Sequence, residues 1–214
     1  MTVERWTFGE SPLPTVIELA GALRELTSTV LSLERSSPEL DRLLVELRGV
    51  QARLAAEAPL DPRPRVGADF TVDQRVYVDH SRDIGDYNPC FPQYEFEVDV
   101  EGETAHGTVD FPVCYEGPPG IVHGGFLAVF FDCVLQHLNC DLGQAGKTAE
   151  LSLRFRRPTP LLTPLVVRAE RTIEDQRIRS HAELRRDDVV LCEAHMLAAL
   201  GDRAALPIVS PRTP

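Results

Sequence analysis

The amino-acid sequence predicts an α+β fold in which a curved antiparallel sheet wraps around one buried helix, with a helical extension at the N-terminus. Three observations indicate this arrangement. Residues 15–58 carry apolar side chains at helical spacing, later segments alternate apolar and polar side chains, and residues 124–138 are apolar nearly all the way round. A helix without a polar face must be buried. A sheet that curves around it provides that burial economically.

Residues 15–58 are expected to form two amphipathic helices. Ser37 suits the N-cap of the second helix, and Pro38 suits its first position, where the missing N–H costs nothing. Three prolines between Ala58 and Arg65 then end the helix and predict an extended spacer. We therefore expect an extension with its linker at 1–65, a main domain at 66–201 and a C-terminal tail at 202–214. The extension could cover the main domain, mediate assembly, recruit a partner, or simply pack.

Strands are expected where the apolar period changes from helical to two. This alternation is typical of an antiparallel sheet with one covered face. Two such segments precede the buried helix and three follow it, namely 95–100, 104–111, 151–156, 178–185 and 190–196.

Composition excludes several classes of protein. The net charge of −11 argues against nucleic acid as a partner, because phosphate binding favours a basic surface. No apolar run approaches the roughly 20 residues that span a bilayer, and the N-terminus lacks the order of a signal peptide. Five scattered cysteines without a Cys-x-x-Cys motif indicate reduced thiols in a cytoplasmic protein rather than a disulfide framework or a metal site.

Asp132 lies within the apolar helix, between phenylalanines and valines. An ionised carboxylate in such surroundings costs several kcal/mol unless something compensates it. One interpretation is structural: Asp132 accepts hydrogen bonds at a seam between subunits. The other is that Asp132 is a general base or a nucleophile.

The same helix is expected to begin at Gly124 and Gly125, directly after His123. The first N–H groups of a helix have no partners within it and lie at the positive end of its dipole. Two glycines let a ligand approach them, which suits an oxyanion hole, although a tight turn alone would also explain them. Gly124 and Asp132 are eight residues apart, about 12 Å along one helix. A two-fold axis that sets two such helices antiparallel would bring Asp132 of one subunit to Gly124 of the other, so we expect a homodimer, or a tetramer, with shared active sites.

Two runs of sequence resemble a known family. Residues 115–125, Tyr-Glu-Gly-Pro-Pro-Gly-Ile-Val-His-Gly-Gly, followed by Asp132, and residues 147–158 resemble the hotdog-fold acyl-CoA thioesterases, most of all their PaaI-like branch with the thioesterase-superfamily-member proteins. The resemblance covers residues 66–201, and the N-terminal helices have no counterpart in it. It implies hydrolysis of an acyl-CoA, or of an acyl-carrier-protein thioester, with CoA entering as part of the substrate and no other cofactor.

The resemblance also implies catalytic roles. Asp132 would activate water or form an anhydride, the backbone at Gly124 would polarise the carbonyl, and His123 would shape the loop. Thr148 matches a hydroxyl residue that helps to place the attacking water. Strand alternation, however, points Thr148 away from the apolar face, so a bulge or a partner subunit would have to bring it near Asp132.

Further residues are candidates for substrate binding. Some branches of the family have an asparagine at the position of Gly117, and many have a small residue at the position of Gln136, next to the acyl chain. Arginine side chains bind phosphates in bidentate fashion, so Arg154, Arg156 and Arg157 are the candidates for the phosphates of CoA. An exposed strand with salt bridges would explain these arginines as well. The candidates for substrate contact are Gly117, Gly125, Gln136, Asn88 (in a loop over the acyl group, or in a plain turn), Arg154, Arg156 and Arg157.

Two other functions remain open from the sequence. A non-catalytic protein that binds acyl-CoA would be consistent with Gln136 and with the helical extension. An enoyl-CoA hydratase would need a histidine beside the acid, and His137 lies off the helical face of Asp132.

Overall fold

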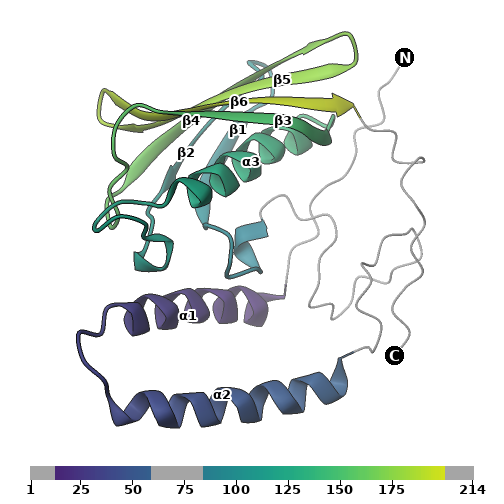
Figure 1. Ribbon diagram of the computed structural model, residues 1–214. Helices are drawn as coiled ribbons and strands as arrows, with labels where there is room; N and C mark the ends of the chain where they lie inside the picture. The colour runs from purple at the N-terminus through teal and green to yellow at the C-terminus, as the bar shows by residue number, and fades with distance from the viewer. Residues whose placement is uncertain (1–12, 59–83, 201–214) are drawn as a thin grey trace.

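The computed structural model describes residues 13–58 and 84–200 (Figure 1). The spacer from Pro59 to Arg65, the predicted domain start at Val66 and the tail at 202–214 lie outside these residues. In chain order the elements are α1 (Pro14–Leu31), α2 (Pro38–Glu57), the 3-10 turn η1 (Ile84–Asp86), β1 (Tyr94–Asp99), β2 (Thr104–Val109), the 3-10 turn η2 (Val113–Tyr115), α3 (Gly124–Asp141), β3 (Gly146–Phe155), β4 (Leu165–Glu174), β5 (Arg177–Arg186) and β6 (Val189–Leu200).

The strands form one six-stranded antiparallel sheet in the order β1-β2-β4-β5-β6-β3. The sheet curves over α3, which lies against its concave face (Figure 1). Because one face is covered, residues on β4 and β5 alternate between buried and exposed along the strand. The predicted fold, a curved antiparallel sheet around one central helix, is confirmed.

The central helix α3 supplies much of the core. Its fully buried side chains include Phe130, Phe131, Val134, Leu135 and Leu138. Together with the buried Cys133 and Asn139, these side chains cover more than half of the helix circumference, which explains why its sequence has no polar face.

Strand β4 was not among the predicted segments, and Arg171 is one reason. This arginine occupies an inward position on the strand and is only 5% exposed. Its guanidinium donates hydrogen bonds to the backbone oxygens of Gln144 (2.9 Å) and Asn139 (3.4 Å) at the end of α3, and lies 3.3 Å from a carboxylate oxygen of Glu103. Burial lowers the pKa of Arg171, while Glu103 opposes this effect. The positive charge of Arg171 interacts favourably with the negative end of the α3 dipole, and its hydrogen bonds hold the C-terminal end of α3 against the sheet.

The two N-terminal helices are present as predicted, and α1 docks onto the main domain. Arg24 is 6% exposed and donates hydrogen bonds to the backbone oxygen of Gly85 (2.8 Å) and to Oε1 of Gln93 (2.9 Å). Ser28 accepts a hydrogen bond from the backbone N–H of Cys114. These contacts anchor α1 beside η1 and η2.

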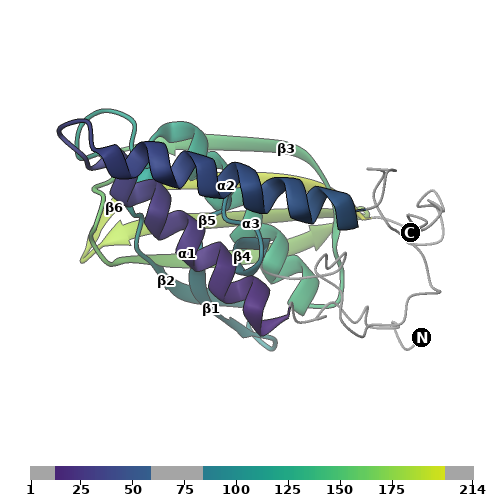
Figure 2. The same ribbon diagram turned by 90° about the horizontal axis from the view of Figure 1, so that it is seen from below.

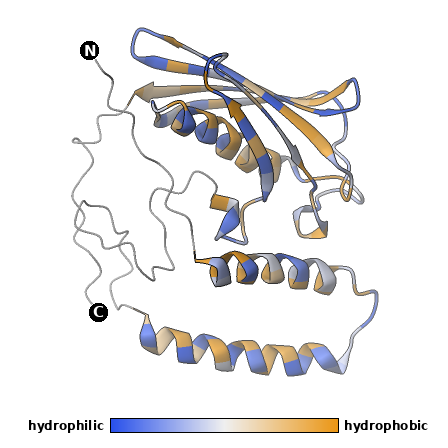
Figure 3. Cartoon of the chain, turned by 180° about the vertical axis from the view of Figure 1, so that it is seen from behind, coloured by the Kyte–Doolittle hydropathy of each residue, from blue (hydrophilic) through white to orange (hydrophobic). Residues whose placement is uncertain are grey.

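Helix α2 begins as the sequence predicts but buries no residue. Ser37 caps it by accepting a hydrogen bond from the N–H of Glu39, and Pro38 takes its first position. The helix lies below α1 on the side away from the sheet (Figure 1). Coloured by hydropathy, both N-terminal helices display apolar patches (Figure 3).

All five cysteines are free, and Cys133 and Cys192 are buried. Burial raises the pKa of the Cys192 thiol to about 12. Within residues 13–58 and 84–200, no helix has the length and apolar character needed to cross a bilayer. No cluster of three or more histidine, cysteine, aspartate or glutamate side chains suited to a metal ion occurs in that part of the chain.

Candidate active site

Asp132 lies on α3 where the helix faces β3. Its side chain is half-buried, with the buried residues Phe131 and Cys133 on either side. Oδ1 of Asp132 accepts a hydrogen bond of 2.8 Å from the hydroxyl of Thr148, which is exposed. The carboxylate therefore lies among apolar side chains but has one donor and an opening to the surface.

A β-bulge places Thr148 next to Asp132. On the paired strand β6, the inward residues Ala198 and Met196 oppose Thr148 and Leu151, and the register shifts between Thr148 and Glu150. The additional residue is Ala149, and it reverses the alternation that would otherwise turn Thr148 outward. The bulge thus brings Thr148 to Asp132 within one chain, and no partner subunit is needed for this contact.

Gln136 lies one helical turn after Asp132 and contacts the same hydroxyl. Its Nε2 is 2.8 Å from Oγ1 of Thr148 and 3.0 Å from the backbone oxygen of Gly146. The side chain therefore ties α3 to the first residues of β3. Gln136, Thr148 and Asp132 form a continuous row of hydrogen bonds.

The start of α3 forms a second cluster of candidate residues. His123 is the N-cap, and its Nδ1 accepts a hydrogen bond of 3.0 Å from the N–H of Gly125. His123 donates its own backbone N–H to the backbone oxygen of Tyr115. Among the residues that the structure describes, the N–H of Gly124 has no acceptor. One donor at the positive end of the helix dipole is thus available to an incoming oxygen.

Gly124 lines a pocket of about 400 Å³ between the start of α3 and the end of β3. Phe155 and Arg157 line the same pocket, and a Cβ placed on Gly124 would lie 3.1 Å from the end of the Phe155 ring. Phe155 is 58% exposed although it continues the inward series of β3. The sequence analysis did not include Phe155 among the candidate site residues. The feature that could have identified it is a large apolar residue that lies between arginines at the end of the strand.

Gly117 packs against the N-cap residue. A Cβ at this position would lie 2.8 Å from Cα of His123 and 3.0 Å from its Cβ. No side chain fits there without displacing His123, which explains in physical terms why the asparagine of some thioesterase branches is absent here.

We therefore expect Gly117→Ala to destabilise the fold by about 1–3 kcal/mol through overpacking. The matched control is Gly21→Ala on α1, where an added Cβ would meet nothing within 4 Å and where alanine favours a helix. Urea unfolding of the two variants measures the difference. Equal midpoints would contradict the steric explanation.

The remaining predicted residues are more dispersed. Arg154 is an exposed residue of β3, and the exposed Arg156 directly follows this strand. Arg156 pairs with Glu193 at 2.8 Å, and this hydrogen bond lowers the pKa of Glu193. Asn88 caps a turn by accepting a hydrogen bond from the N–H of Cys90, and it donates its own backbone N–H to Ile84. The structure thus brings together Asp132, Thr148 and Gln136 in one cluster, and His123, Gly124, Gly125, Gly117 and Arg157 in another.

Comparisons with known proteins bear on the fold. No protein-family model matches the chain. Among solved structures, a thioesterase superfamily protein is 28% identical with a TM-score of 0.71, covering 88% of this chain and 97% of its own. A phenylacetic acid degradation-related protein from Ralstonia eutropha is 24% identical with a TM-score of 0.44, covering 50% of this chain and 82% of its own. A hypothetical thioesterase from Streptococcus pneumoniae, solved with coenzyme A, is 20% identical with a TM-score of 0.46, covering 50% and 88%.

The first of these matches covers more of the chain than residues 66–214 could provide, so it extends into the N-terminal helices. This corrects the expectation that the helical extension has no counterpart. The extension is instead shared with at least one other protein of this kind. By its fold and by this match, the chain is a hotdog-fold protein of the thioesterase superfamily.

Proposed function

We propose that the protein hydrolyses acyl-CoA thioesters to a free acid and CoA. The observation that carries this proposal is the half-buried carboxylate of Asp132, which receives a hydrogen bond of 2.8 Å from Thr148 on the opposing strand. A carboxylate held in apolar surroundings by a single directed donor suits general-base catalysis. The match to a thioesterase superfamily protein over most of both chains supports the same chemistry.

In the proposed reaction, Asp132 takes a proton from a water molecule while the water oxygen attacks the thioester carbonyl carbon. Thr148 donates its only hydrogen to Asp132 and keeps a lone pair that can accept a hydrogen bond from this water. The N–H of Gly124 stabilises the negative charge that develops on the carbonyl oxygen. The C–S bond then breaks, and the leaving thiolate takes the proton from Asp132.

The alternative is a nucleophilic Asp132 that forms an acyl anhydride. A single turnover in water labelled with oxygen-18 distinguishes the two routes. The general-base route puts the label into the released acid, whereas the anhydride route first puts it into the protein carboxylate.

We propose further that each active site is shared across a homodimer. Gly124 and Asp132 are about 12 Å apart on α3, too far for one thioester carbon to lie beside both. Strand β3 is at the edge of the sheet and is ten residues long. A long edge strand is a template for pairing with another chain. A two-fold axis beside β3 would set two α3 helices antiparallel and bring Asp132 of one subunit to Gly124 of its partner.

Arg157 is the proposed contact for the CoA phosphates, because it lines the pocket that contains Gly124. Arg156 lines the same pocket but is already paired with Glu193. Arg154, on the outer face of the sheet, is a weaker candidate. Five free thiols are compatible with a cytoplasmic location.

A panel of acyl-CoA esters of different chain length and aromatic character, followed with a thiol reagent, tests the proposed function. We expect release of CoA from at least one class of ester. Measurable affinity for CoA esters without thiol release from any of them would instead favour a non-catalytic binding protein.

A further inference from the structure

We infer that Gln136 is a positioning residue that directs the hydroxyl hydrogen of Thr148 to Asp132. This inference rests on the proposed function. The inference goes beyond the proposed function, because it gives Gln136 a role in orienting Thr148. The family resemblance does not assign this role, and Gln136 does not line the pocket that contains Gly124. Hydrogen bonds run in one row from Gly146 through Gln136 and Thr148 to Asp132.

The chemistry of the partners fixes the direction of each hydrogen bond. The backbone oxygen of Gly146 can only accept, so the amide atom of Gln136 that lies 3.0 Å from it must be the nitrogen. That same nitrogen lies 2.8 Å from Oγ1 of Thr148, and it has two hydrogens, one for each neighbour. Thr148 therefore accepts from Gln136.

A threonine hydroxyl has one hydrogen. Since Thr148 accepts from Gln136, its hydrogen remains available for Oδ1 of Asp132, which lies 2.8 Å away. Without the amide, the hydroxyl could rotate and direct its hydrogen to another acceptor. Gln136 thus acts through Thr148 and contacts no reacting atom itself.

Double substitution tests this coupling by steady-state kinetics with an acyl-CoA ester that the wild-type chain hydrolyses. Gln136→Met keeps the length of the side chain but removes the donor. We expect kcat to fall roughly 5- to 10-fold, the effect of one hydrogen bond, while KM stays unchanged. In a Thr148→Val background, which has no hydroxyl to orient, Gln136→Met should have no further effect on kcat. In a Thr148→Ser background, which keeps the hydroxyl, its effect should persist.

An unchanged kcat for Gln136→Met, or an equal loss in the Thr148→Val background, would overturn the inference, because the two side chains would then act independently. A rise in KM alone would assign Gln136 to substrate binding instead and would also overturn it. If the wild-type chain releases no thiol, the proposed function itself fails and this role fails with it.

A second, independent inference concerns the apolar stripe on α2, which consists of Leu44, Leu47, Val50 and Leu54. These side chains are 46%, 43%, 42% and 58% exposed. Most of the stability of a helix in a protein comes from the packing of an amphipathic face, yet α2 buries none of its residues within the described chain. A continuous exposed stripe of this kind marks an interaction surface.

We propose that the α2 stripe packs antiparallel against the α2 stripe of a second copy of this chain. The charges along the helix favour this occupant. The first half of α2 contains Glu39, Asp41 and Glu46 against one arginine, whereas the second half contains Arg48 and Arg53 against Glu57. Antiparallel pairing places each acidic half beside a basic half, and parallel pairing would place like charges together.

The position of α2 is compatible with the proposed dimer. Seen from below, α2 runs across α3 on the side of β3, while α1 crosses towards β1 and β2 (Figure 2). The same two-fold axis could therefore relate the edge strands and the α2 helices.

Cysteine cross-linking of the full chain tests this pairing. In a Cys90→Ser background, Leu47→Cys lies near the two-fold axis, so we expect a covalent dimer on mild oxidation. Leu54→Cys alone should not cross-link, because the two cysteines at position 54 of the paired helices would lie about 20 Å apart along the helix axis. A mixture of Leu54→Cys and Leu40→Cys chains should cross-link. The Cys90→Ser chain without a new cysteine is the control for native thiols.

The proposal is overturned if Leu47→Cys stays monomeric on oxidising gels, which would mean that the stripe is covered by another part of the chain or by a different protein. Efficient cross-linking of Leu54→Cys alone would indicate parallel pairing and would contradict the charge argument.

Discussion

Asp132→Asn should reduce the rate of thiol release from acyl-CoA by about 10²–10⁴-fold, the usual effect of removing a general base. The amide has nearly the same shape and can still accept a hydrogen bond from Thr148, which lies 2.8 Å from the native carboxylate. It cannot accept a proton from water at neutral pH. The loss should therefore appear in kcat, with little change in folding.

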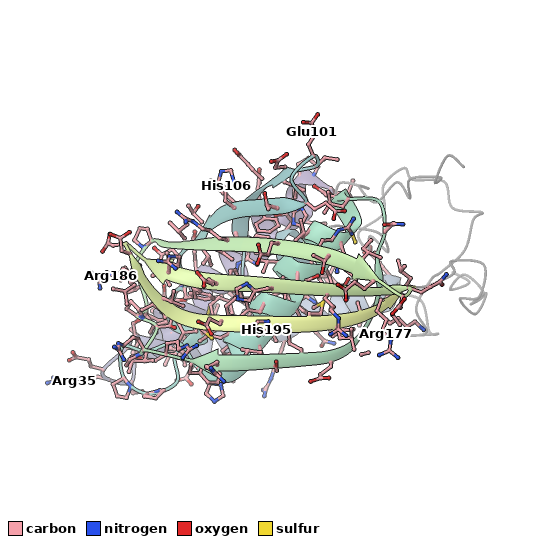
Figure 4. The ribbon with its side chains drawn as sticks, turned by 90° about the horizontal axis from the view of Figure 1, so that it is seen from above. Arg35, Glu101, His106, Arg177, Arg186 and His195 are labelled. Atoms are coloured by element: carbon pink, nitrogen blue, oxygen red, sulfur yellow. The ribbon has the colours of Figure 1, made fainter. Side chains whose placement is uncertain are left out.

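The matched control is Glu101→Gln, the same chemical change in the exposed turn between β1 and β2 (Figure 4). Its kcat should equal that of the wild type. Circular dichroism and urea midpoints should be the same for both variants. Retention of wild-type activity by Asp132→Asn would remove the base from the proposed mechanism.

Gly124→Pro should lower kcat by about 10²–10³-fold, the usual effect of removing one oxyanion donor. Proline removes the backbone N–H that has no acceptor within the described residues. It is tolerated at the first position of a helix. His123 has φ −65° and ψ 133°, an extended conformation that a following proline permits.

Gly124→Ala is the control, because it adds a Cβ but keeps the N–H. That Cβ would lie 3.1 Å from the end of the Phe155 ring, which is exposed and can move. We expect the alanine variant to stay within a few-fold of the wild type. Equal losses for the two variants would show that bulk, and not the donor, matters at this position.

The sequence alone predicted most of the fold because its periodicities are strong. Helix α3 could be identified because a segment that is apolar on every side must be buried. The N-terminal helices could be identified from their regular apolar spacing and from the Ser37-Pro38 start. Strand β4 was less visible, because Arg171 occupies an inward position that a pattern of apolar residues cannot predict.

The candidate site was harder to predict than the fold. Its individual residues were visible, since a carboxylate among phenylalanines and a Gly-Gly after histidine are unusual. Their contacts were not. The bulge at Ala149 depends on pairing with β6, which is remote in sequence, so strand alternation pointed Thr148 the wrong way. The contact of Gln136 with Thr148 follows from the same bulge.

Mixing two inactive variants tests most directly whether two chains share each active site. Asp132→Asn and Gly124→Pro chains are unfolded together, refolded and assayed for thiol release. In a shared site, each mixed dimer has one site with both substitutions and one site with neither. Random pairing should then restore about a quarter of wild-type activity. If the mixture stays as inactive as its separate components, Asp132 and Gly124 do not act together across a subunit interface.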